Sequence, residues 1–553
     1  MPIFRKVIDR LIYQEMYPHI DDGMTDSNIG ARKHLNIKNH LFIVYAVINS
    51  VLNENRKCVT IHIYDLVKAF DVLWLADSMN ELWDTLDGSV RDDKLGLIFE
   101  MSKSNLVAVN TAVGQTDRVE IREIVTQGET WGPMLCSNSI DRVGRFASES
   151  GQIYKYKSLT DVVPLAMVDD LLSINDCGFK SVESNISINT LIELKKLTFH
   201  VPNTEKKSKC HYMHIGKESP FCPGMKVHGV QTERVIEAPY LGDIVSADGK
   251  NTSNIKARVS KGLGIVSEIM HILKTISFGH RYFDIAKILR EARFVNGILT
   301  NAEVWYALKK SEICELEKLD ILLLRRILAA PTSSCIESLY LELGLIPIGT
   351  IIRARRLNYL HYLMSQPKQS MLYKVFKTQW DYPVKGDWVL EVREDMLEFG
   401  LSMSLEEIQK ISKSKFKQLV KIKATEFALE NLLDEKEKHS KMKDLIYSEL
   451  KMQSYLCDSS LTVEEAQNLF RFRTRTAKFK ENMKNKYENG SLTCPACGLQ
   501  PDSQSHSFQC EVMKQHIKVK GQYSDIFKKK VPSDVAKSLL EVSKIREQQF
   551  SPI

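Results

Sequence analysis

The sequence predicts an α+β protein of several domains, in which a mixed N-terminal region precedes a long helical region. Strand-like and helix-like patterns alternate over the first 245 residues, whereas residues 251–365 show helical periodicity almost throughout. A cluster of Cys and His lies within the last seventy residues. At 553 residues the chain is too long for one hydrophobic core, so three or four domains are expected.

The N-terminal region is predicted to be a small sheet covered by helices. Apolar residues at helical spacing predict an amphipathic helix over 36–56, and a buried strand follows over 59–64. Two strands about a turn at Gly114-Gln115 are predicted within 105–126. The remaining helices are predicted over 72–87, 132–148 and 182–197. Residues 153–175 are predicted to form a strand, a loop and an acidic strand or hairpin, and further strands are predicted over 209–215 and 235–244.

Prolines and glycines punctuate the rest of the chain. Pro331 and Pro347 break the helical region, and residues 366–390 contain enough Pro and Gly to predict a linker. Residues 403–450, rich in Lys and Glu, predict long charged helices.

Composition narrows the function classes. The net charge of +7 is modest, but basic residues cluster in 351–360 and 471–486, which points to a polyanionic partner. The alternative, a solvated surface, is not excluded by overall charge. Eleven cysteines without disulfide-framework spacing indicate a reducing compartment. The N-terminus has no apolar h-region, and no run of 18 apolar residues occurs. We therefore expect an intracellular protein, nuclear or cytoplasmic, with no secretion signal and no membrane partner.

Acidic residues follow two β-type apolar runs. The first run, within residues 61–71, ends at Asp65, and the second, within 165–172, ends at Asp169 and Asp170. Carboxylates that converge from separate strands can hold two Mg²⁺ ions about 4 Å apart for phosphoryl transfer. Packing three carboxylates together is costly without cations, because like charges raise each other's pKa. The alternative is that this acidic pair lies on an ordinary loop, which is common.

The order of the intervening segments resembles the reverse transcriptase of non-LTR retrotransposons, of the type-1 retrotransposable element Pol proteins. IYDLVKAFDVLW resembles motif A of that family, QGETWGPML motif B and AMVDDLL motif C, with Met167-Val168 where many members have Tyr-Ala or Phe-Ala. KKSKCHYMHIG resembles motif D, and APYLGDIVSADG resembles the YLG segment. The resemblance covers roughly residues 20–365.

The resemblance implies a role for each matching residue. Asp65, Asp169 and Asp170 would be catalytic carboxylates that bind two Mg²⁺ ions, and Phe70 would discriminate the sugar. Lys209 or Lys207 would be the motif D lysine that protonates pyrophosphate, and spacing to the next strand favours Lys209. The residues implied to line the nucleotide pocket are Gln127 and Gly128.

The resemblance also implies an architecture and an activity. A right-hand polymerase fold is expected, with partial fingers over 1–58, a palm over 59–245, a helical thumb over 246–365, a helical linker region over 366–485, and a CCHC zinc knuckle with tail over 486–553. The expected activity is RNA-directed DNA polymerisation with an RNA template, a DNA primer or target and dNTPs. Only about 30 residues precede the segment that resembles the end of the fingers, so an N-terminally truncated copy is expected. The alternative is a catalytically inactive, truncated or domesticated nucleic-acid-binding protein.

Two basic segments are candidate nucleic-acid contacts. Arg353, Arg355 and Arg356 lie on a predicted helix with aromatic residues beyond them, so they can track phosphates, or they can pair with nearby Glu. The run over 471–486 has seven cations and two interleaved phenylalanines, Phe472 and Phe479. Its candidate contacts are Arg471, Arg473 and Arg475; the alternative is that these cations solvate a helix or pair with the Glu-rich segment 430–437.

The C-terminal cluster has the spacing Cys494-x2-Cys497-x8-His506-x3-Cys510. Two cysteines across a tight turn, followed by His and Cys one helical turn apart, can complete a tetrahedral Zn²⁺ site. Four ligands leave no open position, so the one Zn²⁺ would be structural. Unconnected thiols beside a surface His are the alternative.

Overall fold

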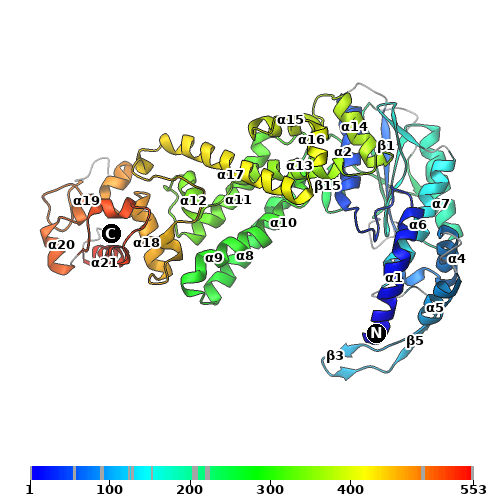
Figure 1. Cartoon of the computed structure of the whole chain (residues 1–553), viewed down its shortest axis with the longest axis horizontal. Helices are drawn as coiled ribbons and strands as arrows, with labels where there is room; N and C mark the ends of the chain where they lie inside the picture. Colours follow the sequence, from blue (N-terminus) through cyan, green and yellow to red (C-terminus); the bar gives the residue numbers. More distant parts are fainter. Residues whose placement is uncertain are drawn as a thin grey trace. The chain divides into compact units, whose positions relative to one another are not determined.

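The computed structural model describes residues 3–53, 58–86, 92–122, 125, 130–150, 153–201, 209–217, 224–486, 492–517 and 519–549. These residues form a mixed α+β chain in which helices outnumber strands (Figure 1). The chain divides into two compact units. Unit 1 comprises Met1–Asn251, Val304–Ala307 and Leu363–Glu391, and unit 2 comprises Thr252–Glu303, Leu308–Tyr362 and Val392–Ile553. In the described part of the chain, no helix has the length and apolarity needed to cross a membrane.

The centre of unit 1 is a five-stranded sheet with the order β13-β10-β1-β9-β8. Neighbouring strands pair antiparallel, except that β10 and β13 pair parallel. Apolar residues alternate with polar ones along β1, yet its first six residues are all buried, as expected for a central strand covered on both faces. The strands are β1 (Val59–Asp65), β8 (Leu165–Met167), β9 (Asp170–Asp176), β10 (His211–Ile215) and β13 (Glu233–Arg234).

Short two-stranded ladders complete the strands of unit 1. The hairpin predicted within 105–126 is present, but its turn lies at Ala112-Val113, before the predicted Gly114-Gln115. The YLG segment forms a hairpin whose turn places Leu241 and Gly242 at positive φ. These strands are β2 (Ser104–Val107), β3 (Asn110–Thr111), β4 (Gly114–Gln115), β5 (Val119–Arg122), β6 (Tyr154–Tyr156), β7 (Thr160–Val162), β11 (Lys226–Val227), β12 (Val230–Gln231), β14 (Glu237–Tyr240) and β15 (Asp243–Ser246).

Helices cover the sheet of unit 1, and four of them, α2, α4, α6 and α7, match the sequence-based ranges. The 21-residue helix α1 was not predicted from the sequence. Its apolar residues Met16 and Ile20 are buried in the hydrophobic core together with Trp131 and the first residues of α6. The helices are α1 (Ile3–Gly23), α2 (Ile37–Asn53), α3 (Ala69–Val72), α4 (Leu75–Thr85), α5 (Asp92–Ser102), α6 (Gly132–Glu149), α7 (Phe179–Leu194) and α14 (Met371–Asp381).

Helix α2 shows where the sequence-based interpretation was wrong. An amphipathic helix was expected, but every residue from Asn39 to Val51 is buried. The face of α2 that was expected to be exposed is covered by residues 366–390. These residues were predicted to be a linker and instead form α14 and the start of α15 (Trp388–Glu398). Trp388 is fully buried and packs edge-on against Phe42 of α2, with ring centroids 5.3 Å apart. The segment is therefore part of the core of unit 1 and not a linker.

A buried ion pair fixes this segment in place. The Lys157 ammonium lies 2.8 Å from the Asp387 carboxylate, and both side chains are almost fully buried. The Asn49 amide donates to the same carboxylate at 2.9 Å. Removing one partner of such a pair leaves an uncompensated buried charge, which costs about 3–5 kcal/mol. These polar contacts give residues 384–388 one defined position against α2.

Unit 2 is built from helices. The stretch predicted as helical over 251–365 is confirmed, with breaks around Pro331 and Pro347. Helix α17 is the long yellow helix of Figure 1. Besides short 3-10 helices, the described helices of unit 2 are α8 (Thr252–Thr275), α9 (Tyr282–Leu289), the π-helix η3 (Arg290–Val295), α10 (Asn296–Ile298), α11 (Lys310–Ile327), α12 (Ile336–Leu343), α13 (Ile348–Met364), α16 (Leu405–Lys410), α17 (Lys413–Glu437), α18 (Val463–Arg473), α19 (Gln504–Ser507), α20 (Glu511–His516) and α21 (Ser533–Gln549).

Candidate active site and Cys/His cluster

The acidic residues of the two predicted strand ends lie next to each other in the sheet of unit 1. Strands β1 and β9 pair antiparallel, and their register places Asp65 directly opposite Asp170. Directly opposed residues share a face and have Cβ atoms about 4.5–5.5 Å apart. Asp169 belongs to the two-residue turn that joins β8 to β9, where Val168 has a positive φ of 56°. We call Asp65, Asp169 and Asp170 the acidic hairpin cluster.

The negative charge of this cluster is only partly balanced by basic side chains. Burial, Asp169 and Asp65 together raise the pKa of the Asp170 carboxyl to about 6, and the opposing effect of Lys209 is smaller. Two basic groups approach Asp65 at its Oδ2 atom: Lys209 Nζ and His200 Nε2, each at 3.3 Å. That oxygen is buried and accepts no well-directed hydrogen bond from the described residues. A buried carboxylate oxygen that accepts no well-directed hydrogen bond, beside an acid with a raised pKa, fits a cation-binding position.

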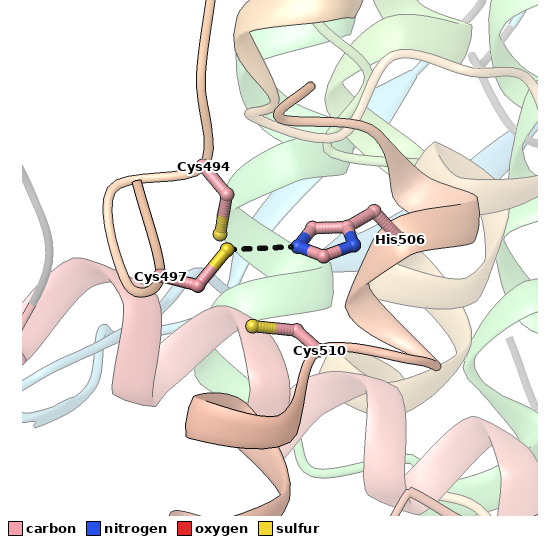
Figure 2. Close-up of side chains that lie close together, drawn as sticks. All are labelled: Cys494, Cys497, His506 and Cys510. Atoms are coloured by element: carbon pink, nitrogen blue, oxygen red, sulfur yellow. Dashed lines mark hydrogen bonds between the residues drawn. The ribbon is translucent and has the colours of Figure 1, made fainter. Parts of the chain in front are cut away.

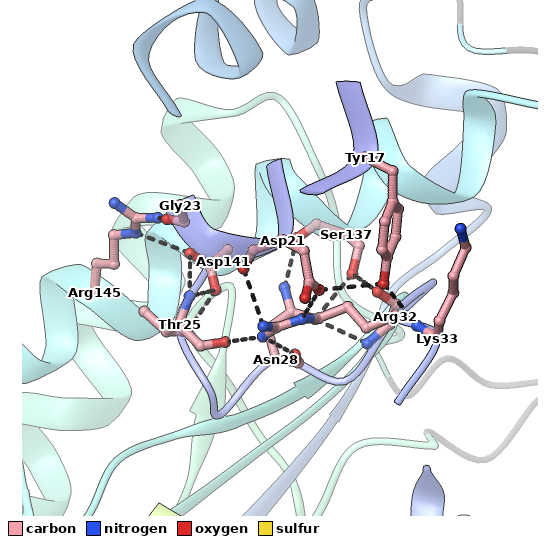
Figure 3. A network of polar contacts seen from close by, with 11 residues as sticks. Tyr17, Asp21, Gly23, Thr25, Asn28, Arg32, Lys33, Ser137, Asp141 and Arg145 are labelled. Carbon is pink, nitrogen blue, oxygen red and sulfur yellow. Dashed lines mark hydrogen bonds and ion pairs between the residues drawn. The ribbon is translucent and has the colours of Figure 1, made fainter. Parts of the chain in front are cut away.

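The loop between α1 and α2 supports the turn that carries Asp169. Ile29 N donates to Ala166 O at 3.0 Å, and Ala166 N donates to Ser27 O at 3.0 Å, so the loop pairs with β8. The Asn28 side chain is fully buried and binds Ser137 of α6 through its amide and its carbonyl oxygen (Figure 3). A Cβ atom on Gly30 would lie 2.3 Å from Ser137 Oγ and 2.8 Å from Val168 N, so only glycine fits beside this turn.

Further polar contacts tie the same loop to α1 and α6 (Figure 3). Arg32 donates to the Asp21 carboxylate at 2.6 Å and to the Thr25 carbonyl at 2.6 Å. Thr25 N donates to Asp141 of α6 at 3.1 Å, and Arg145 binds the same carboxylate at 2.8 Å. No sequence pattern pointed to these contacts, and the one between Thr25 and Asp141 joins residues 116 positions apart.

The YLG hairpin reaches the same loop through a hydrogen-bonded chain. His40 is fully buried, and its Nε2 lies 2.9 Å from the Ser27 carbonyl. A carbonyl only accepts, so Nε2 carries the proton and Nδ1 accepts from the Tyr240 hydroxyl at 3.2 Å. Burial lowers the His40 pKa to about 3, which keeps the ring neutral. Burial and the nearby Asp170 raise the pKa of Tyr240. Tyr240, at the end of β14, is thus close enough to the acidic hairpin cluster for the charge of Asp170 to affect its pKa.

Three predicted nucleotide-pocket residues are not placed by the structure. Phe70 belongs to the short helix α3, but its side chain lies outside the described ones. Gln127 and Gly128 also lie outside the described residues, as does Lys207, the alternative to Lys209. Lys209 itself lies beside Asp65, with its Nζ 3.3 Å from Oδ2 of that residue, and its role as the motif D lysine stays a prediction. Sequence reasoning missed His200, which no motif marks.

The arginines predicted on α13 are engaged within unit 2. Arg356 is buried and donates twice to Asp395, at 2.7 and 3.2 Å. Arg353 pairs with Asp395 at 3.2 Å and with Glu398, and Arg355 donates to the Leu299 carbonyl at 2.7 Å. Nucleic-acid binding by these residues stays a prediction, and the contacts favour the alternative in which they pair with acidic neighbours.

The basic run is also occupied by contacts within unit 2. Arg473 is buried and lies 3.1 Å from the Glu342 carboxylate, while Arg475 pairs with Asp444. Arg471 donates to the Ala329 carbonyl at 3.1 Å. Phe472 and Phe479, which interleave the run, are both buried and pack edge-on against each other. Helix α18 ends at Arg473, and the following residues bring the Phe479 ring back against Phe472.

The four residues of the C-terminal Cys/His cluster come together (Figure 2). Their ligand atoms, the sulfurs of Cys494, Cys497 and Cys510 and a ring nitrogen of His506, all lie within 4.8 Å of one another. The chain turns tightly after Cys494: Gly498 N donates to Cys494 O at 2.8 Å, and Gly498 has a φ of 67°. His506 lies on α19 and Cys510 caps α20, so two short helices supply the other half of the set.

Backbone amides stabilise the thiolate form within this cluster. The amides of Leu499 and Gln500, together with His506, lower the pKa of the Cys497 thiol to about 6. Burial raises the pKa of Cys494, and the amides of Cys497 and Ala496 oppose that effect. Cys497 Sγ lies 3.3 Å from His506 Nε2. A tetrahedral Zn²⁺ with one sulfur and one nitrogen ligand separates those two atoms by about 3.5 Å, so the donor set fits this ion.

A comparison of sequences finds no matching protein-family profile and no matching curated protein. Among solved structures, the chain is similar to the telomerase from Candida albicans, determined in complex with a fragment of telomeric RNA. The identity is 12% and the TM-score 0.28, over 61% of this chain and 54% of that chain. The chain thus spans about half the length of that protein. A similarity of this size is distant and does not establish a shared activity.

Proposed function

We propose that the chain is an RNA-directed DNA polymerase of the kind found in non-LTR retrotransposons. One observation carries the proposal: β1 and β9 set Asp65 opposite Asp170, and the turn beside them carries Asp169. The order of sequence segments that resemble motifs A to D supports it, because Asp65 belongs to the first and Lys209 to the last. On this proposal unit 1 contains the palm, and the first helices of unit 2 form the thumb.

Each residue of the site has a proposed task. Asp65, Asp169 and Asp170 would hold two Mg²⁺ ions, which supply positive charge to the attacking and leaving oxygens. Lys209, whose side chain is exposed next to Asp65, would donate a proton to the departing pyrophosphate. His200 would help to hold the Asp65 carboxylate in position. Phe70 would exclude ribonucleotides, and Gln127 with Gly128 would line the nucleotide pocket.

The Cys/His cluster is proposed to hold one structural Zn²⁺. Three thiolates and one imidazole complete a tetrahedron without an open position. The ion would join the turn at Cys494–Cys497 to α19 and α20, as a zinc knuckle. Chelation should release zinc and reduce the helical signal of the intact chain. If Cys494→Ser keeps zinc as well as Cys457→Ser, an exposed thiol elsewhere in unit 2, this assignment is wrong.

Primer extension on poly(rA) annealed to oligo(dT) tests the polymerase directly. We expect the intact chain to incorporate dTTP in Mg²⁺ and to stop when Mg²⁺ is chelated. Asp170→Asn should lose the activity, whereas Asp176→Asn at the other end of β9 should keep it. Equal extension by both variants would refute the assignment of the site. A protein that binds the hybrid but never extends it would instead support the alternative, a non-enzymatic nucleic-acid-binding protein.

A further inference from the structure

A second group of metal-binding side chains lies in the central sheet of unit 1, at the end opposite to the acidic hairpin cluster. Cys58, Cys177 and His214 bring two sulfurs and one ring nitrogen within 4.8 Å of one another. Cys58 immediately precedes β1, and Cys177 immediately follows β9. Asp65 ends β1 seven residues after Cys58, a separation of about 23 Å along an extended strand. The group is therefore distinct from the proposed catalytic site.

The sheet register explains why these three residues meet. Val59 pairs with Asp176, so Cys58 lies opposite Cys177, and Cys177 N donates to Cys58 O at 3.3 Å. Thr60 pairs with His214 across β1 and β10, and residues 58 and 60 share one face of β1. Three strands thus each contribute one side chain to the same face.

The geometry fits a tetrahedral thiolate and imidazole site. Cys177 Sγ lies 3.5 Å from His214 Nδ1. Bond lengths of about 2.3 Å to sulfur and 2.0–2.1 Å to nitrogen place two such ligands about 3.5 Å apart around Zn²⁺. Cys58 and His214 are buried and Cys177 is partly buried. Because the three ligand atoms already lie within 4.8 Å of one another, they need only small movements to bind one ion.

The second nitrogen of His214 is held in the way that metal-ligating histidines require. His214 Nε2 lies 3.0 Å from the Lys217 carbonyl, which can only accept a hydrogen bond. Nε2 therefore carries the proton, and the lone pair of Nδ1 faces Cys177. A backbone carbonyl in this role fixes the tautomer and the ring orientation of a metal-binding histidine. The Thr60 hydroxyl, 3.5 Å from Cys177 Sγ, can donate to the thiolate.

We propose that Cys58, Cys177 and His214 bind a Zn²⁺ ion, which cross-links β1, β9 and β10. Two thiolates select a borderline-soft cation over Mg²⁺, which prefers oxygen ligands. Three protein donors leave a fourth position for water or a small ligand. Binding displaces the thiol protons, so zinc uptake releases protons to solvent. This cross-link joins the strands that carry Asp65 and Asp170 to the strand that follows Lys209.

Metal counting on the intact, reduced chain tests the proposal. We expect about two zinc ions per chain in the wild type, one in the Cys/His cluster and one in this site. Cys177→Ser and Cys497→Ser should each lose one. Cys314→Ser, an exposed thiol of α11, should lose none. His214→Gln should also lose one, because an amide can keep the hydrogen bond to Lys217 but supplies no imidazole nitrogen.

A spectroscopic measurement distinguishes this site from the Cys/His cluster. Co²⁺ bound to two thiolates gives intense charge-transfer absorption, and the Cys497→Ser protein should keep such a signal from this site. The proposal would be overturned if Cys497→Ser lost all the zinc of the wild type while Cys177→Ser and His214→Gln lost none. So would a disulfide between Cys58 and Cys177 in the purified protein, because the pair would then serve as a covalent cross-link.

Discussion

The acidic hairpin cluster of unit 1 and the basic run of unit 2 differ in how their charges are balanced. In the acidic cluster, burial and the neighbouring carboxylates raise the pKa of Asp170 to about 6, against the smaller effect of Lys209. In the basic run, Arg473 is buried 3.1 Å from Glu342, and Lys478 lies 2.6 Å from Glu547. The acidic hairpin cluster has more negative than positive charge, whereas these two cations of the basic run form ion pairs with carboxylates of the same protein.

This difference separates a binding site from a structural contact. An unbalanced charge gains free energy when a counter-ion arrives, whereas a balanced charge must first give up its partner. Substitutions in the acidic cluster should therefore remove function and leave the fold intact. Substitutions in the basic run should weaken the fold and change ligand binding little.

The largest expected effect tests the acidic cluster as a unit. Asp65→Asn and Asp170→Asn should each reduce primer extension by about 10³-fold or more, corresponding to about 4 kcal/mol of transition-state stabilisation. The double variant should lose little beyond either single one, because residues that act together are not additive. Single-turnover extension rates measure all three. Independent, multiplicative losses would contradict the idea of one shared site.

The next effect concerns stability in the basic run. Arg473→Gln should lower the free energy of unfolding by about 3–5 kcal/mol, because it leaves Glu342 buried without its partner. The matched change Arg475→Gln breaks the more exposed pair with Asp444 and should cost at most about 1 kcal/mol. Urea denaturation of the intact chain gives both values.

Nucleic-acid binding by the same variants sharpens the comparison. If Arg475 contacts a phosphate, its loss should flatten the slope of log affinity against log salt by about 0.7–0.9. We expect no change, since Asp444 already occupies this guanidinium. If Arg475→Gln flattens the slope of log affinity against log salt, the basic run does contact nucleic acid.

The pH dependence of stability should differ in sign from that of an ordinary ion-paired carboxylate. The pKa of Asp170 is raised in the folded state, from 3.8 to about 6, so the folded chain binds more protons than the unfolded chain between these values. Its contribution to stability is thus present at low pH and is lost as pH rises through about 6. Without Mg²⁺, lowering the pH from 7 to 5 should raise the melting temperature of the wild type more than that of Asp170→Asn. An equal response of the two proteins would show that Asp170 is ionised normally.

The sequence predicted correctly those features that depend on residues close together in the chain. Strand β1, its acidic end and the Cys/His spacing follow from periodicity and ligand spacing within short segments. The errors arose where distant segments meet. Helix α2, expected to be amphipathic, is buried all round because the distant segment that contains α14 and Trp388 covers it. Gly30 supports the turn at Asp169 through contacts that no local pattern records.

The smallest expected effect concerns Phe70, whose role rests on the resemblance and on its place in α3, five residues after Asp65. If its ring lies under the sugar of the incoming nucleotide, Phe70→Val should admit ribonucleotides and reduce the preference for dTTP over UTP by about 10–100-fold. A loss of this size, about 1–3 kcal/mol, is typical of a change in steric fit at a pocket wall. Val72→Ala, in the same helix, serves as the control and should leave the preference unchanged. The ratio of kcat/KM for the two nucleotides on one template measures the effect. If Phe70→Val extends normally with an unchanged ratio, the acidic cluster can still be the catalytic site, and another residue excludes the ribose hydroxyl.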